Sequence, residues 1–187
     1  MEILLSLLAT KVVAGIIGVV ALLGVKQSDV IITPPVTKVV SDSIYINTTL
    51  KNSFPKELEK IVLSGTPVTI RLKLSLSDKN TTLTQEAIHQ IAYELSTKTF
   101  FLWFDFAHHK TGNRNDTLKL KDFAKAKEFM NKFKIGINFK LPNNEKFTGI
   151  LKATLDPITI EAMGGRQFDL MCFWDYHTPT FKFFIKQ

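Results

Sequence analysis

The stretch VTIRLKLSL, residues 68–76, decides the fold class because its apolar and polar side chains alternate without interruption. The apolar positions are Val68, Ile70, Leu72, Leu74 and Leu76. A period of two places these side chains on one face of a β-strand and the polar ones on the other. Antiparallel sheets that pack one face on a core and turn the other to water have this pattern. The sequence therefore predicts a β-rich domain around this strand.

Strand signals continue on both sides of this stretch. Residues 43–51 alternate in the same way, and residues 99–107 are rich in strand-forming aromatic side chains. Residues 82–96 fit either a helix capped by Thr82 and Gln85 or a strand from residue 88, and the aromatic run that follows favours the strand, with a hairpin through residues 96–98. We expect a second hairpin about Pro142-Asn143-Asn144, and strands at residues 135–141, 147–155, 168–174 and 181–185.

Two helices complete the predicted domain. In the first, Ser53 is placed to cap, Pro55 suits the first turn and Gly65 can adopt the left-handed stop. The second covers residues 120–133, where apolar side chains recur at helical spacing and lysines occupy the other face. About eight short strands and two short helices predict a mainly β (α+β) fold, an antiparallel β-sandwich-like domain.

The N-terminal segment predicts a membrane anchor. Residues 3–25 are apolar apart from Ser6, Thr10 and Lys11, and as a helix they would measure about 34 Å, enough to span a bilayer. The alternative is a cleaved signal peptide in which Lys11 ends the positive region, but no small-x-small cleavage site follows residue 25. We expect residues 1–26 to be a single transmembrane helix, residues 27–42 an extended tether containing Pro34 and Pro35, and residues 43–187 the β-rich domain.

Composition limits the possible partners. The chain has 187 residues and a net charge of +7, yet only three of its 24 basic residues are arginines. Lysine lacks the planar fork with which arginine reads phosphates and bases, so we expect no nucleic-acid partner. A lysine-rich surface near a bilayer is instead attracted to anionic head groups. The single cysteine, Cys172, excludes an intramolecular disulfide and a cysteine-based metal cluster.

Candidate catalytic chemistry is sparse. Asp175 and His177 would share one face of a strand, and with His108, His109 or Asp105 they would offer a metal or acid–base site. Adjacent histidines point to opposite sides of a strand, so both cannot easily join such a site. We therefore predict no catalytic residue, no metal and no cofactor, and a metal-dependent enzyme ranks third among the functional classes, ahead of nucleic-acid binding only.

Aromatic residues concentrate in residues 100–106 and 168–184. Sequence neighbours on a strand face opposite ways, so one member of each Phe-Phe pair must point away from a single core. The candidate interaction surface consists of Phe101, Trp103, Trp174, Tyr176 and Phe183. On the second predicted helix, Lys121, Lys125 and Lys132 are the candidate contacts with an anionic membrane.

The order of features between residues 41 and 174 carries a resemblance. It includes an early strand, a helix ending in the Leu63-Ser64-Gly65-Thr66-Pro67-Val68 turn, a long hairpin, a helix near residues 122–131 and a late Leu155-Asp156-Pro157 element. In this order the chain resembles a family of small bacterial membrane-anchored envelope (periplasmic) proteins of uncharacterised function. The resemblance implies an anchored periplasmic β domain and assigns no catalytic residue.

These observations predict a non-enzymatic, membrane-anchored structural or interaction subunit of a bacterial envelope assembly, and a large machine such as a flagellar motor or secretion system would suit it. We expect a single-pass inner-membrane protein with its C-terminal domain in the periplasm, bound to protein partners or to copies of itself. The alternative is a periplasmic module that binds a lipid or another apolar ligand between its sheets.

Overall fold

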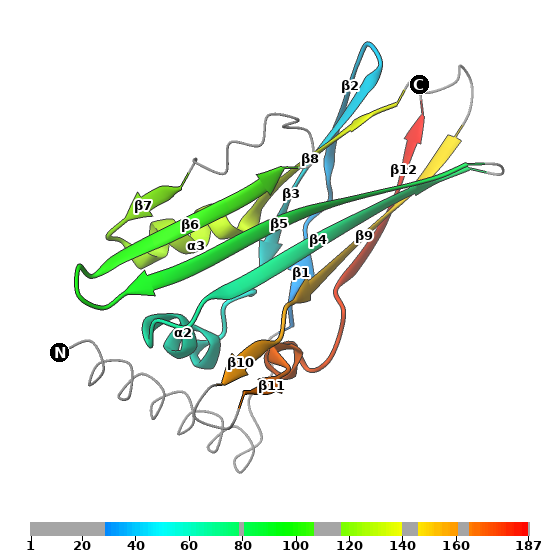
Figure 1. Cartoon of the computed structure of the whole chain (residues 1–187). Coiled ribbons are helices and arrows are strands. Elements are labelled where there is room, and N and C mark those ends of the chain that lie inside the picture. The colour runs from blue at the N-terminus through cyan, green and yellow to red at the C-terminus, as the bar shows by residue number, and fades with distance from the viewer. Residues whose placement is uncertain (1–28, 79–80, 107–116, 140–145, 161–164, 187) are drawn as a thin grey trace.

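The computed structural model describes residues 29–78, 81–106, 117–139, 146–160 and 165–186, which form antiparallel sheets with two α-helices (Figure 1). The elements are β1 (Ile31–Ile32), β2 (Val36–Val40), β3 (Ser43–Lys51), α2 (Lys56–Leu63), β4 (Val68–Ser77), β5 (Thr82–Glu94), β6 (Thr99–Phe106), β7 (Leu118–Leu120), α3 (Phe123–Asn131), β8 (Lys132–Asn138), β9 (Lys146–Leu155), β10 (Ile158–Ile160), β11 (Arg166–Phe168), the 3-10 helix η2 (Leu170–Trp174) and β12 (Thr180–Lys186). The predicted mainly β, antiparallel fold with two helices is confirmed.

The larger sheet has six strands in the order β12-β9-β4-β5-β6-β7. The alternating stretch at residues 68–76 forms β4, which pairs with β5 on one side and β9 on the other. All five of its apolar side chains are buried, while Arg71 and Lys73 lie on the opposite face. The strand predicted from alternation alone is confirmed and has a central place in the sheet.

The smaller sheet is built on β3, whose boundaries match the predicted strand. One edge of β3 pairs first with β2 and then with β1, and the other edge pairs with β8. The extended tether predicted over residues 27–42 is therefore wrong from residue 31 onward. Pro34 and Pro35 cannot donate to a ladder, but they only separate β1 from β2 without ending the association with β3.

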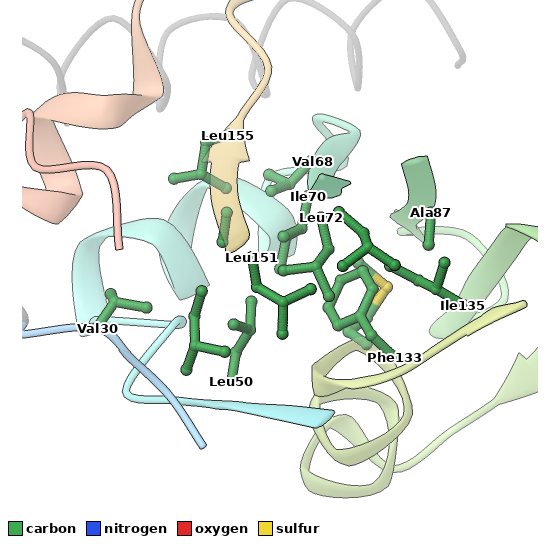
Figure 2. Packing of buried hydrophobic residues seen from close by; sticks show 14 of the residues in the cluster. Val30, Leu50, Val68, Ile70, Leu72, Ala87, Phe133, Ile135, Leu151 and Leu155 are labelled. Atoms are coloured by element: carbon green, nitrogen blue, oxygen red, sulfur yellow. The ribbon is translucent and has the colours of Figure 1, made fainter. Parts of the chain in front are cut away.

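The two sheets face each other across one hydrophobic core. Figure 2 shows Ile70, Leu72 and Leu151 of the larger sheet meeting Leu50 and Phe133 of the smaller one. His89 of β5 lies in the same interface, with its ring stacked on that of Phe133 at 3.8 Å between centroids. Large side chains such as Trp174, Phe147 and Phe173 fill the remaining space.

Several predicted elements differ because pairing partners lie far apart in sequence. The hairpin expected about Pro142 is wrong, since β8 pairs with β3 while β9 pairs with β4 and β12; the connecting residues 140–145 lie outside the described residues. The helical alternative for residues 82–96 is also wrong, because β5 is a strand from Thr82 to Glu94. The strand expected at residues 168–174 is instead β11 followed by η2, which begins where Asp169 accepts a hydrogen bond from the Met171 N–H.

Both predicted helices form, with different boundaries. The helix expected at residues 120–133 is shorter, because Leu120 ends β7 and Phe133 lies in β8. Ser53 does not cap α2: its hydroxyl donates to Asn131 Oδ1, and Pro55 holds the N-cap position. Gly65 has a φ of +90°, which confirms the left-handed stop.

The predicted anchor, residues 1–26, lies outside the described residues. No helix within the described ranges is long enough and apolar enough to cross a membrane.

Asp122 is the N-cap of α3, and its replacement by alanine is expected to lower the free energy of unfolding by about 1 kcal/mol. Its Oδ1 accepts hydrogen bonds from the Ala124 N–H at 2.8 Å and the Lys125 N–H at 3.2 Å, which alanine cannot do. Urea unfolding of the two proteins measures the difference. Asp122→Ser keeps a capping oxygen and should recover most of the loss; an equal loss for serine and alanine would contradict the capping role.

Candidate interaction surfaces

The outer face of the smaller sheet combines exposed apolar side chains with lysines. Along each strand, alternate side chains such as Ile44 and Ile46 point into the core, and the side chains between them face outward. We call this outward set the basic face; it comprises Ile31, Val36, Lys38, Val40, Tyr45, Lys51, Lys132 and Lys134. At its centre, Asn47 lies between Val36 of β2 and Lys134 of β8.

The charges on the basic face have one sign. In β1, β2, β3 and β8 the charged residues are four lysines, and no aspartate or glutamate occurs in these strands. Within the described residues, Lys132 is the member of the four that forms an ion pair, with Glu128 of α3. Lys132 Nζ donates a hydrogen bond to Glu128 Oε1, and this bond together with the lysine charge lowers the pKa of the Glu128 carboxyl. The other three lysines concentrate positive potential on the face.

The apolar side chains of the basic face are exposed to solvent. Val36 exposes 67 % of its surface and Tyr45 exposes 46 %. Of the nine large apolar residues that the described ranges expose, four lie on this one face. Exposed apolar residues scattered singly need no explanation, whereas residues gathered on one face indicate a contact surface.

The outer face of the larger sheet carries a different feature, an aromatic patch formed by Phe101 and Trp103 of β6. Their ring centroids lie 6.2 Å apart with the planes inclined by 20°, and Lys119 Nζ lies 5.3 Å from the Phe101 centroid. Across the strand pair, Ala92 lies opposite Phe101 and Gln90 lies opposite Trp103. Both side chains are half-buried, so each keeps part of its surface accessible on this outer face.

Charges of both signs lie on the same face as the aromatic patch. Arg71 Nη2 donates to Asp156 Oδ2 at 2.8 Å, and Nη1 donates to Glu86 Oε2 at 3.1 Å. These hydrogen bonds raise the pKa of Arg71 above its ordinary value, and the bond with Asp156 has the largest effect. The outer face of the larger sheet is therefore mixed in charge, unlike the basic face.

Of the five residues predicted to form one interaction surface, the structure brings only Phe101 and Trp103 together. Trp174 is not on a surface: it is 1 % exposed, and its Nε1–H donates to the Ser53 carbonyl at 2.9 Å. Phe183 lies over Gly149 of the neighbouring strand and is half-buried. Tyr176 is 69 % exposed, but it follows η2, away from β6.

The predicted membrane-contact lysines, Lys121, Lys125 and Lys132, are all exposed. Lys132 belongs to the basic face, opposite Thr49 of β3. Lys125 lies one helical turn before Phe129, which is 45 % exposed and lies three residues before Lys132. Two of the three lysines thus adjoin the basic face, whereas Lys121 precedes the N-cap of α3.

The residues considered for a metal or acid–base site do not form one in the described ranges. Asp175 and His177 follow η2 in a turn, where Asp175 has a φ of +59°, instead of sharing a strand face. His108 and His109 lie outside the described residues. Among the residues that are described, no three His, Cys, Asp or Glu side chains gather as metal ligands.

Sequence reasoning missed the β2 part of the basic face. Val36, Lys38 and Val40 fall within the predicted tether because two prolines precede them, although their spacing of two is the signal of a strand face. Comparison with protein-family models, curated proteins and solved structures finds no match to this chain. The resemblance to small envelope proteins stays a prediction.

Proposed function

We propose that this chain is a non-enzymatic structural or interaction subunit of a bacterial envelope assembly. In this proposal residues 1–26 anchor the chain in the inner membrane, and the β domain lies in the periplasm. The observation that supports it best is the aromatic patch, where Phe101 and Trp103 lie side by side on the outer face of a sheet. The partner is a protein of the same assembly, or a second copy of this chain.

The chemistry of the patch suits a protein interface. Tryptophan and phenylalanine are enriched in interfaces because a flat ring gives a large contact area at a small cost in conformational entropy. Residues that dominate binding energy are often aromatic and have polar groups around them that exclude water on binding. Here Gln90 and Lys119 flank the rings, and the Arg71 ion pairs with Asp156 and Glu86 lie on the same face.

The alternative, a ligand-binding module that opens between the sheets, receives less support. Such a module needs an apolar cavity of a few hundred Å³ between its sheets. In this chain Phe133, Phe147, Trp174 and the leucines of β4 occupy the space between the two sheets. A ligand would have to displace several of these side chains, each of which contributes to stability.

Trp103→Ala is expected to weaken partner binding at least tenfold, because truncating an aromatic hot spot at the centre of an interface costs about 2 kcal/mol or more. The measurement is native mass spectrometry of the full chain extracted from its own membranes, which reports protein partners, copies of the chain and lipids together. The matched control is Tyr176→Ala, which removes an exposed aromatic side chain outside the patch.

A stoichiometric protein partner or homo-oligomer that is lost with Trp103→Ala and kept with Tyr176→Ala supports the proposal. A monomer that carries only lipid overturns it in favour of the ligand-binding module. Equal loss of the partner with both substitutions would move the interface away from the aromatic patch.

A further inference from the structure

The short distance between the predicted anchor and the sheet bears on how the domain sits at the membrane. The apolar segment ends at residue 25, and β1 begins at Ile31, so five residues connect them. A fully extended chain of this length spans about 20 Å. Because β1 and β2 pair with β3, residues from 31 onward belong to the sheet and do not lengthen the connection to residues 1–26. If residues 1–26 are an anchor, the β domain must lie close to the bilayer surface.

The basic face begins at the point where the chain enters the sheet. Ile31, the first residue of β1, is itself on this face and is paired with Lys51. From there the face continues over β3 to Lys134 of β8, with lysine as the charged residue throughout. The sheet that the chain enters after residues 1–28 and Asp29 therefore has lysines as the charged residues of its strands.

An anionic bilayer is the occupant that fits this chemistry. Its head groups attract lysines close to the surface, and its interfacial region accepts the side chains that the face exposes, Val36, Val40 and Tyr45. On α3, Lys125 and Phe129 extend the same combination of cation and apolar ring beside Lys132. The opposite outer face also carries lysines, and Lys146 Nζ lies 3.9 Å from the ring centroid of the exposed Phe184, but Arg71 there is paired with Asp156 and Glu86, so its charges are of both signs.

We propose that the basic face docks the domain on the anionic head groups of the bilayer that holds its anchor, with the aromatic patch turned away from the membrane. The inference rests on the proposed function for the anchor and for the role of the aromatic patch. It adds an orientation: since the two surfaces are the outer faces of two opposed sheets, contact of one with lipid leaves the other free for a partner.

The test measures how close each face lies to lipid, in the full chain reconstituted into phosphatidylcholine vesicles with and without phosphatidylglycerol. Cys172 is first replaced by alanine; burial raises the pKa of its thiol to about 11, so alanine removes a poorly reactive group. A fluorescent label is then attached at Asn47→Cys on the basic face or at Thr84→Cys on the opposite face. Lipids with a nitroxide on the head group quench a label that lies at the surface.

We expect quenching at position 47 and not at position 84, only in vesicles that contain phosphatidylglycerol, with loss of quenching at high salt. The triple variant Lys38→Gln, Lys51→Gln, Lys134→Gln should reduce the ratio of docked to undocked domains about a hundredfold, about fivefold for each lysine. The control variant Lys73→Gln, Lys152→Gln, Lys182→Gln makes the same change in net charge on exposed residues of the other sheet and should leave the ratio unchanged.

Three results would overturn the inference: equal quenching at both positions, no quenching at position 47, or equal effects of the two triple variants. An absence of quenching at position 47 would leave an acidic protein as the occupant of the basic face. These vesicles contain no partner protein, so the result is independent of the Trp103→Ala experiment. All substituted lysines are exposed, and thermal unfolding of each variant confirms that a lost signal is not a lost fold.

Discussion

Gly149→Val is expected to lower the free energy of unfolding by about 3 kcal/mol, as overpacking does at a buried site that cannot relax. Gly149 of β9 is directly opposite Phe183 of β12, and the phenyl ring lies over the glycine. A Cβ at residue 149 would meet three ring carbons of Phe183, all within 2.8 Å, closer than non-bonded carbons can approach. The strand therefore needs glycine here for space, although its backbone conformation is ordinary.

A double-mutant cycle tests this explanation. Gly149→Ala should be destabilising alone, and Phe183→Leu should relieve much of that cost because it removes the ring that occupies the space. Urea unfolding of the wild type, the two single variants and the double variant gives the coupling free energy. If the two losses simply add, the ring is not the obstacle, and the cost of a side chain at residue 149 has another cause.

Stability should fall steeply as the pH is lowered from about 6.5 to about 4, because of His89. This side chain is fully buried, its Nδ1 lies 3.0 Å from the Met130 carbonyl, and its ring is between those of Phe104 and Phe133. Burial lowers the pKa of His89 from 6.5 to about 4. In this interval the unfolded chain binds a proton that the folded chain does not, so stability increases with pH.

The slope follows from linkage. One proton corresponds to about 1.4 kcal/mol per pH unit, so the folded state loses about 3 kcal/mol between the two pKa values. Urea unfolding at a series of pH values measures this slope for the wild type and for His89→Phe, which should be less stable at neutral pH but shallower in slope. His177→Asn changes an exposed histidine and serves as the control. An unchanged slope in His89→Phe would refute the assignment.

Local patterns predicted the parts of the fold that local chemistry determines. The alternation at residues 68–76, the β3 strand and the left-handed Gly65 all follow from side chains within a few residues, and all three are confirmed. The predicted β8–β9 hairpin is wrong because a turn-forming Pro-Asn-Asn sequence indicates that the chain turns. It does not indicate which strands pair with β8 and β9. Long-range pairing decided that, and a single sequence does not contain it.

The candidate surfaces were only partly predictable for a related reason. Trp103 and Trp174 lie in equally aromatic segments, and whether each is exposed depends on its element: Trp103 is on the outer side of β6, whereas Trp174 is on a 3-10 turn that enters the core. The Ser53 carbonyl that receives the Trp174 N–H is 121 residues away in the sequence. The β2 part of the basic face was missed because this strand directly follows a proline pair.

The way in which the chain crosses between the sheets has a consequence for the order of events during synthesis. Ser43 is paired with Asn138 and Ile70 with Leu155, so neither sheet can be completed until the C-terminal third of the chain has left the ribosome. The β2–β3 hairpin and the β4–β5–β6 meander can form early, since their contacts are local. The inner faces of these strands stay exposed until β8 and β9 have been synthesised and have paired. During this interval the exposed apolar surface makes the nascent domain prone to aggregation.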